Sequence, residues 1–224
     1  MREGAIEFRM EQNTPEWFAV RLGYVTASSI NKVITLGGKR SSSIGEYASE
    51  LACEVFTGKS CRELDGDPWS GNYWTRRGHA LENDAKISYE EKFGKTLDAS
   101  YGFVALGDMD WGFSPDAIDE DGVPVDFKCL SAKKHLNVMR DPHKGVGDYY
   151  LQLQNQLYIA GSDKAILYYF HPSLPSFRVV MPLDVHIQDG MLMRVKECLE
   201  TRNMLLEEMG RTGGSYEFEP TARY

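Results

Sequence analysis

The chain has 224 residues, of which 42% are hydrophobic and 26% are charged. This composition is typical of a globular domain and excludes a disordered chain, and no stretch reaches the ~20 apolar residues that a membrane-spanning helix needs. The formal net charge of −8 at pH 7 argues against a protein that coats nucleic acid over its whole surface, since such proteins carry extended basic faces.

Helical spacing of apolar residues dominates the first half of the chain. In the segment SIGEYASELACEVFTG, Ile44, Tyr47 and Leu51 fall on one helical face, and Gly58 provides the stop. The predicted helices are residues 15–21, a stretch after the turn at Gly23 that is capped by Thr26 or Ser28, residues 43–57 and residues 77–93.

Short aromatic and β-branched runs then predict strands. YGFVAL and MDWGF form one hairpin around a glycine–aspartate turn, and DAIDEDGVPVDFKC forms a second around Asp121-Gly122. The remaining predicted elements are a helix over 147–161, strands over 164–170 and 177–183, and a helix over 187–209. This order predicts an α/β fold in which helices pack against a central mixed sheet of about five strands.

Cysteine spacing and the N-terminal segment indicate the compartment. Cys53, Cys61, Cys129 and Cys198 contain no CxxC pair, which argues against a zinc ribbon. The opening MREGAIEFRM has no apolar core of signal-peptide length. We therefore expect a cytoplasmic protein with reduced, mostly buried thiols and no membrane partner.

Positive charge is clustered despite the acidic total. Lys128, Lys133, Lys134, Arg140 and Lys144 occur against only Asp141, and two smaller clusters are Lys39-Arg40 and Arg76-Arg77. Local basic patches on an acidic body suit an enzyme that binds phosphates in one groove and carries metal-binding carboxylates. Three solvated loops would explain the same clusters, and composition leaves both interpretations open.

The segment GFSPDAIDEDGVPVDFKCLSAKKH carries the strongest chemical signal. Side chains alternate along a strand, so Asp126 and Lys128 are predicted on one face and Phe127 on the other. Asp116 can lie on the neighbouring strand, ~5 Å across the hairpin. Two carboxylates this close repel unless a cation lies between them, and Mg²⁺ prefers such oxygen ligands. The Phe127 carbonyl offers a further oxygen, although an Asp-rich hairpin with an incidental lysine remains the plainer interpretation.

Four segments resemble the phage lambda exonuclease family within the PD-(D/E)xK nuclease superfamily. They are WFAVRLGYVTASSINKVI at 17–34, RGHALENDA at 77–85, SPDAIDEDGVPVDFKC at 114–129 and LQLQNQLYIAG at 151–161. They occur in the family's order and span most of the chain. The resemblance implies a single restriction-endonuclease-like domain over residues 1–224.

The resemblance also implies roles for particular residues. Asp116, Asp126, the Phe127 carbonyl and Glu82 match metal ligands, for two Mg²⁺ ions that Mn²⁺ can replace. Lys128 matches the catalytic lysine, and Gln154 a glutamine near it. Arg21, Ser28 and Ser114 match a pocket for the 5′-terminal phosphate of DNA. Taken without the resemblance, these residues read as an ordinary surface arginine, N-cap serine and polar helix positions.

Two departures from the family pattern stand out. The second metal-binding acid is Asp126, where lambda exonuclease has glutamate, and Thr75 occupies the position of the family's strand-separating leucine. Tyr73 or Trp74 could stack on an unpaired base instead. Further DNA contacts are predicted at Lys39, Arg40, Trp74 and Arg76.

The resemblance implies a Mg²⁺-dependent 5′→3′ exonuclease that degrades one strand of linear duplex DNA from 5′-phosphorylated ends. It further implies a ring-shaped homotrimer, a single-strand annealing protein as partner in phage-type recombination, and a phage or prophage origin in a bacterial host. Two alternatives remain open: a restriction-like endonuclease of the same superfamily and a non-catalytic DNA-end-binding module.

Overall fold

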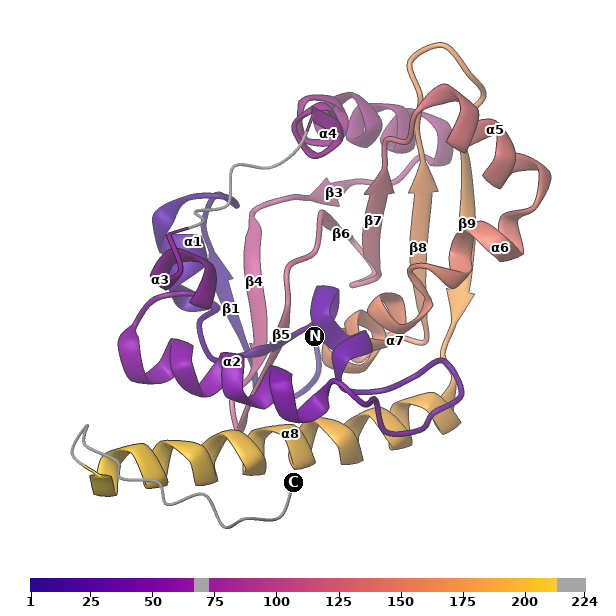
Figure 1. The fold of residues 1–224 in the computed structure, drawn as a ribbon. Coiled ribbons are helices and arrows are strands. Elements are labelled where there is room, and N and C mark those ends of the chain that lie inside the picture. Colours follow the sequence, from indigo (N-terminus) through magenta and orange to yellow (C-terminus); the bar gives the residue numbers. More distant parts are fainter. Residues whose placement is uncertain (67–72, 213–224) are drawn as a thin grey trace.

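The computed structural model describes residues 1–66 and 73–212, without the side chains of 73–76, 79 and 211–212. Its elements in chain order (Figure 1) are β1 (Ala5–Arg9), α1 (Pro15–Val20), β2 (Val25–Thr26), the 3-10 helix η1 (Ala27–Lys32), α2 (Ile44–Thr57), α3 (Cys61–Leu64), α4 (Tyr73–Phe93), β3 (Leu97–Asp98), β4 (Tyr101–Leu106), β5 (Met109–Phe113), β6 (Ala117–Asp119), β7 (Pro124–Lys128), α5 (Ala132–Arg140), α6 (Pro142–Gly147), α7 (Tyr150–Ala160), β8 (Lys164–Tyr169), β9 (Phe177–Pro182) and α8 (Val185–Thr212). The predicted α/β class is confirmed.

The strands form two sheets rather than one central sheet. Hydrogen bonding gives the order β1-β4-β5-β2 in the first and β3-β6-β7-β8-β9 in the second. Both sheets are mixed, because β2 runs parallel to β5 and β7 runs parallel to β8. The chain leaves the first sheet after Phe113 and enters the second at Ala117. Pro115 lies between them, and its lack of an N–H suits a break in the ladder.

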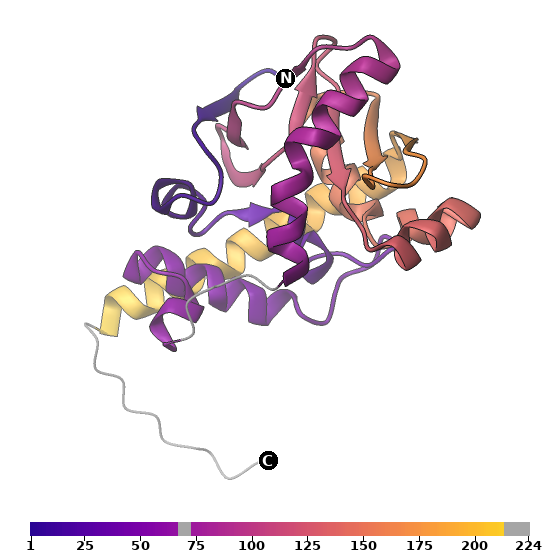
Figure 2. The same cartoon turned by 90° about the horizontal axis from the view of Figure 1, so that it is seen from above.

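The five-stranded sheet is covered on both faces by helices. Val125, Phe127 and Tyr168 pack in one apolar cluster with Ala85 and Tyr89 of α4, and α4 crosses in front of the strands in Figure 2, which is seen from above. The neighbouring positions of β8, Ala165, Leu167 and Tyr169, pack instead with Leu153 and Leu157 of α7. The period-two alternation therefore sends alternate residues of the central strands to different helices.

The first sheet rests on a pair of long helices. Ile44, Ala48 and Leu51 of α2 share a core cluster with Met191 and Val195 of α8, and the two helices lie side by side in Figure 1. Gly58 ends α2 with φ 68°, the left-handed conformation predicted for the stop. In the part of the chain that the structure describes, no helix is long and apolar enough to cross a membrane.

Several elements differ from the sequence predictions. The helix expected to begin near residue 77 begins at Tyr73, and the stretch after Thr26 is 3-10 rather than α-helical. Strands β1 and β3 and helices α3, α5 and α6 were not predicted, and in α5 the buried side chain is His135 rather than an apolar residue. The four cysteines are free thiols as expected, but of these only Cys198 is fully buried.

Candidate active site

The hairpin of β6 and β7 brings Asp116 beside Asp126 and Lys128. Ala117 pairs with Val125 in the antiparallel ladder, and Gly122 turns the chain with φ 78°. Asp116 therefore lies directly before the paired region, where its Oδ2 accepts a hydrogen bond from the Phe127 N–H at 2.6 Å. The geometry has the arrangement predicted from the spacing of the two aspartates.

Lys128 forms an ion pair with Asp126 inside the protein. The Nζ atom of Lys128 contacts Oδ2 of Asp126, and the two side chains are only 18% and 3% exposed. The ammonium also lies 4.6 Å from the centre of the Tyr149 ring. Phe127, between them in sequence, turns its ring into the opposite apolar cluster, so only its backbone carbonyl remains available as a ligand.

The charges of this cluster act strongly on one another. Burial raises the pKa of Asp116 well above its ordinary value, and the negative charges of Asp126 and Glu82 raise it further against the opposing effect of Lys128. Burial alone would lower the pKa of Lys128, but Asp126 and Asp116 outweigh it and raise that pKa. Lys128 is therefore a cation in this arrangement.

Helix α4 contributes two further charged groups near the end of β7. The charge of Glu82 acts on both Asp116 and the Cys129 thiol. Arg77 donates from Nη1 to the carbonyls of Cys129 at 2.9 Å and Leu130 at 3.3 Å. The charge of Glu82 thus reaches the Asp116 carboxyl, and Arg77 fixes the backbone that follows Lys128.

A separate cleft of about 990 Å³ contains two of the three residues predicted to bind a terminal phosphate. Arg21 and Ser28 line it together with Lys32. The Arg21 guanidinium stacks 3.8 Å from the ring centre of Trp17, and its buried Nε has no hydrogen-bond partner. Burial lowers the pKa of Arg21 to about 10. A guanidinium that lines a cleft can bind an anionic ligand through its two terminal nitrogens.

Ser114 reaches this cleft through Trp17. The Trp17 Nε1 donates to the Gly102 carbonyl at 2.8 Å and to the Ser114 Oγ at 3.1 Å. These two bonds fix the indole plane on which Arg21 lies. Trp17 was not singled out from the sequence, although its position four residues before Arg21 in a helix could have indicated the contact.

Residues 16–163 match the family model of the YqaJ-like viral recombinase domain. This chain belongs to that family. All four segments that resemble the lambda exonuclease family lie within the matched range, and that resemblance is confirmed. No curated protein matches the chain in sequence.

Solved structures share the fold of this viral recombinase domain. An alkaline exonuclease (LHK-Exo) from Laribacter hongkongensis superposes with a TM-score of 0.76 at 24% identity, covering 89% of this chain and 98% of that one. The same protein in complex with dAMP gives 0.73 at the same identity and coverage. A phage-related exonuclease from Haemophilus somnus 129PT gives 0.61 at 17% identity, covering 83% and 96%.

The prediction for Gln154 needs correction. Its side chain is fully buried and turned away from Lys128, donating to the Pro182 carbonyl at 2.8 Å and accepting from the Asp184 N–H at 3.0 Å. Gln152 and Gln156 instead donate to Oδ1 of Asp126 at 3.0 and 3.2 Å. Residues four apart share a helix face, whereas residue 154 lies about 200° from residue 152. The i, i+4 spacing of the two outer glutamines was the missed signal.

The carboxylates of the recombinase domain fit a hard cation, although they are not a ready-made metal site. Among the side chains that the structure describes, no three of His, Cys, Asp or Glu lie close enough to hold a metal as they stand. Asp126 is instead neutralised by Lys128, and Asp116 is held by the Phe127 N–H. Burial, and after it the negative charges of Asp126 and Glu82, raise the pKa of Asp116, and a bound cation would offset these effects.

Of the other predicted DNA contacts, the structure describes the side chains of Lys39 and Arg40. Arg40 pairs with Glu197 of α8 at 2.5 Å, and the loop that carries Lys39 and Arg40 lies beside α8 in Figure 1. The side chains of Trp74 and Arg76 lie outside the described residues, as do those of Tyr73 and Thr75. Contacts of these residues with DNA remain predictions.

Proposed function

We propose that this domain is a Mg²⁺-dependent 5′→3′ exonuclease that degrades one strand of linear duplex DNA from 5′-phosphorylated ends. The observation that carries the proposal is the buried cluster of Asp116, Asp126 and Lys128 on one hairpin. Buried charges are retained at a cost in stability, and such clusters are characteristic of functional sites. Membership of a viral recombinase family and the fold shared with two exonucleases support the same activity.

The acids of the cluster would hold the metal. Asp116, Asp126, the Phe127 carbonyl and Glu82 are the proposed ligands for two Mg²⁺ ions, or for Mn²⁺ in their place. Bound metal would supply Lewis-acid stabilisation of negative charge on the attacked phosphate. Gln152 and Gln156 hold Oδ1 of Asp126 in place, which fixes the direction of its other oxygen.

Lys128 contributes a positive charge beside the scissile phosphate. Its raised pKa favours a protonated ammonium, which can orient the attacking water and balance charge on the phosphate oxygens.

Arg21 sets the polarity of digestion. Its guanidinium, with the Ser28 hydroxyl, would hold the 5′-terminal phosphate in the 990 Å³ cleft, and thereby fix which bond reaches Lys128. Ser114 would act through Trp17, which it positions. The 3′ overhangs left by such digestion are substrates for strand annealing, so we further propose that the protein works with a single-strand annealing protein in a bacterial cytoplasm. The homotrimer that the resemblance implies is also part of this proposal.

A linear duplex labelled at either end, with and without a 5′-phosphate, tests the proposal. Incubation with Mg²⁺ should remove label from phosphorylated 5′ ends only, EDTA should prevent this, and a closed circular duplex should survive. Cutting of the circle would identify an endonuclease instead. Binding of ends without any Mg²⁺-dependent cutting would identify an end-binding module.

A further inference from the structure

The outer face of α5 and α6 carries a cluster of exposed cations beside the catalytic hairpin. Lys133, Lys134, Arg140 and Lys144 are all exposed. Among the described residues none of these four forms an ion pair with a carboxylate, whereas Arg9, Lys95 and Arg202 elsewhere are all paired. This basic face is therefore not neutralised within the chain.

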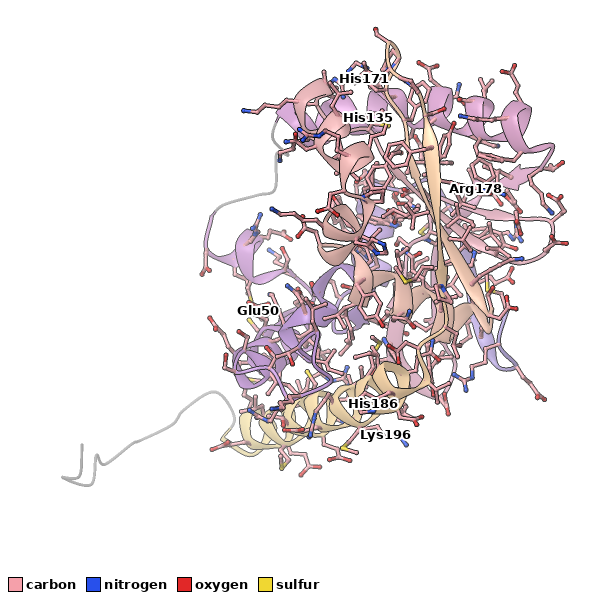
Figure 3. All side chains as sticks on the ribbon, turned by 90° about the vertical axis from the view of Figure 1, so that its right-hand side faces the viewer. Glu50, His135, His171, Arg178, His186 and Lys196 are labelled. Atoms are coloured by element: carbon pink, nitrogen blue, oxygen red, sulfur yellow. The ribbon has the colours of Figure 1, made fainter. Side chains whose placement is uncertain are left out.

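The helix that carries this face is held firmly by its opposite side. His135 is fully buried, and its Nε2 lies 2.9 Å from the Pro175 carbonyl. Its ring packs against those of Phe177, at 5.4 Å, and His171, at 5.9 Å. Figure 3 shows His135 beside His171 at one end of the molecule, and Lys196 at the other. With His135 turned inward, helical periodicity turns Lys133, Asn137 and Arg140 outward.

The basic face is also close to the reacting groups along the chain. Ser131, the N-cap of α5, follows Lys128 by three residues, and Arg77 binds the carbonyls of the two residues after Lys128. Lys133 and Arg140 are seven residues apart, which is about 10 Å along a helix. The positive charge thus extends outward from the site rather than lying within it.

We propose that the basic face of α5 and α6 binds the phosphate backbone of the duplex behind the end that occupies the site. The inference rests on the proposed function and adds a contact surface to it. The surface suits phosphates better than an acidic protein, because Leu136 is the only large apolar side chain exposed on α5 and protein interfaces are built around apolar or aromatic anchors. Asp141 is the nearest acid in sequence, and its carboxylate accepts a bond from the Lys144 N–H.

Binding measured against salt concentration tests the inference without any cleavage. A 5′-phosphorylated duplex is titrated in EDTA from about 50 to 200 mM salt with wild type, Lys133→Gln/Arg140→Gln and the control Lys164→Gln/Lys196→Gln, whose lysines are exposed on β8 and α8. Loss of two phosphate contacts should make the slope of log K against log salt less steep by about 2, and raise Kd at 0.1 M by roughly 50- to 100-fold. Lys133→Arg/Arg140→Lys should restore both.

Each outcome has a distinct meaning. A Kd and slope equal to those of the control double variant would overturn the inference and would leave an acidic protein as the partner of this face. If the wild type itself neither bound nor cut duplex DNA, the proposed function would fall, and the inference with it. Equal loss in both double variants would show a general charge effect and would also overturn the assignment.

Discussion

Two ion pairs of this protein have similar partners and opposite surroundings. Arg9 and Asp98 meet at 2.9 Å with side chains 48% and 45% exposed, whereas Lys128 and Asp126 are 18% and 3% exposed. Water screens the first pair, and such pairs contribute little to stability. Both charges of the second pair were removed from water on folding, and their mutual attraction can fail to offset that cost, so such a pair is weak evidence of stabilisation. Burial of the charges, rather than the number of ion pairs, distinguishes the catalytic hairpin.

The largest expected effect comes from breaking the buried pair at its cation. Lys128→Ala should lower the cleavage rate by about 10³-fold or more, because the charge beside the phosphate is lost, while DNA ends remain bound. Rates are measured under single-turnover conditions and binding in EDTA. Lys128→Arg, which keeps the charge, serves as the control for loss of the buried positive group. Cleavage by Lys128→Ala near the wild-type rate would remove this residue from the mechanism.

Arg21 is the second test, since its partly buried guanidinium forms no ion pair with a carboxylate in the part of the chain that the structure describes. Arg21→Ala should reduce the preference for 5′-phosphorylated over 5′-hydroxyl ends by roughly 10- to 100-fold, the equivalent of one or two charge-assisted hydrogen bonds. Arg9→Ala is the matched control. Trp17→Leu should lower the preference by less, because the guanidinium would remain but lose its stacking surface. An unchanged preference in Arg21→Ala would place the phosphate pocket elsewhere.

The glutamines of α7 have two different roles: Gln152 positions Asp126, whereas Gln154 bonds the Pro182 carbonyl. Gln152→Met should reduce cleavage about tenfold, because Asp126 loses one of the amides that orient it. Gln154→Met should chiefly lower the midpoint of thermal unfolding, because the Pro182 carbonyl and Asp184 N–H lose their partner. Rates and melting curves of the two variants would separate these roles, and the reverse pattern would restore Gln154 to the site.

Asp116 provides a test that depends on pH. Its pKa is raised in the folded state, so at neutral pH the buried charge lowers stability, and Asp116→Asn should stabilise the metal-free protein. The gain should shrink as pH falls through the raised pKa, and vanish below the ordinary aspartate value, where the group is protonated in both states. Urea unfolding in EDTA between about pH 4 and 8 measures this. A gain that is constant with pH would contradict the assigned cause.

Local sequence patterns predicted the strands and helices in which buried residues recur at the regular spacing of a strand or a helix. The alternation in PVDFK placed Asp126 and Lys128 on one face, and Gly58 and Gly94 ended their helices as expected. Helix α5 escaped prediction because its anchor is a histidine bound to the Pro175 carbonyl, a contact 40 residues away in sequence. Likewise, the rotation of α7 that turns Gln154 away from the site is set by β9 and α8, which its own sequence does not reveal.

The smallest effect should come from the exposed ion pair of Arg9 and Asp98. The hydrogen bond to Asp98 raises the pKa of Arg9, yet this cation is exposed to solvent that screens it. Arg9→Gln should therefore leave both cleavage and the midpoint of thermal unfolding unchanged within error. A Gln at position 9 can still bond Ser100, which Arg9 contacts at 2.5 Å. A clear loss of stability in this variant would mean that exposed pairs contribute here as the buried one does, and burial would no longer mark the site.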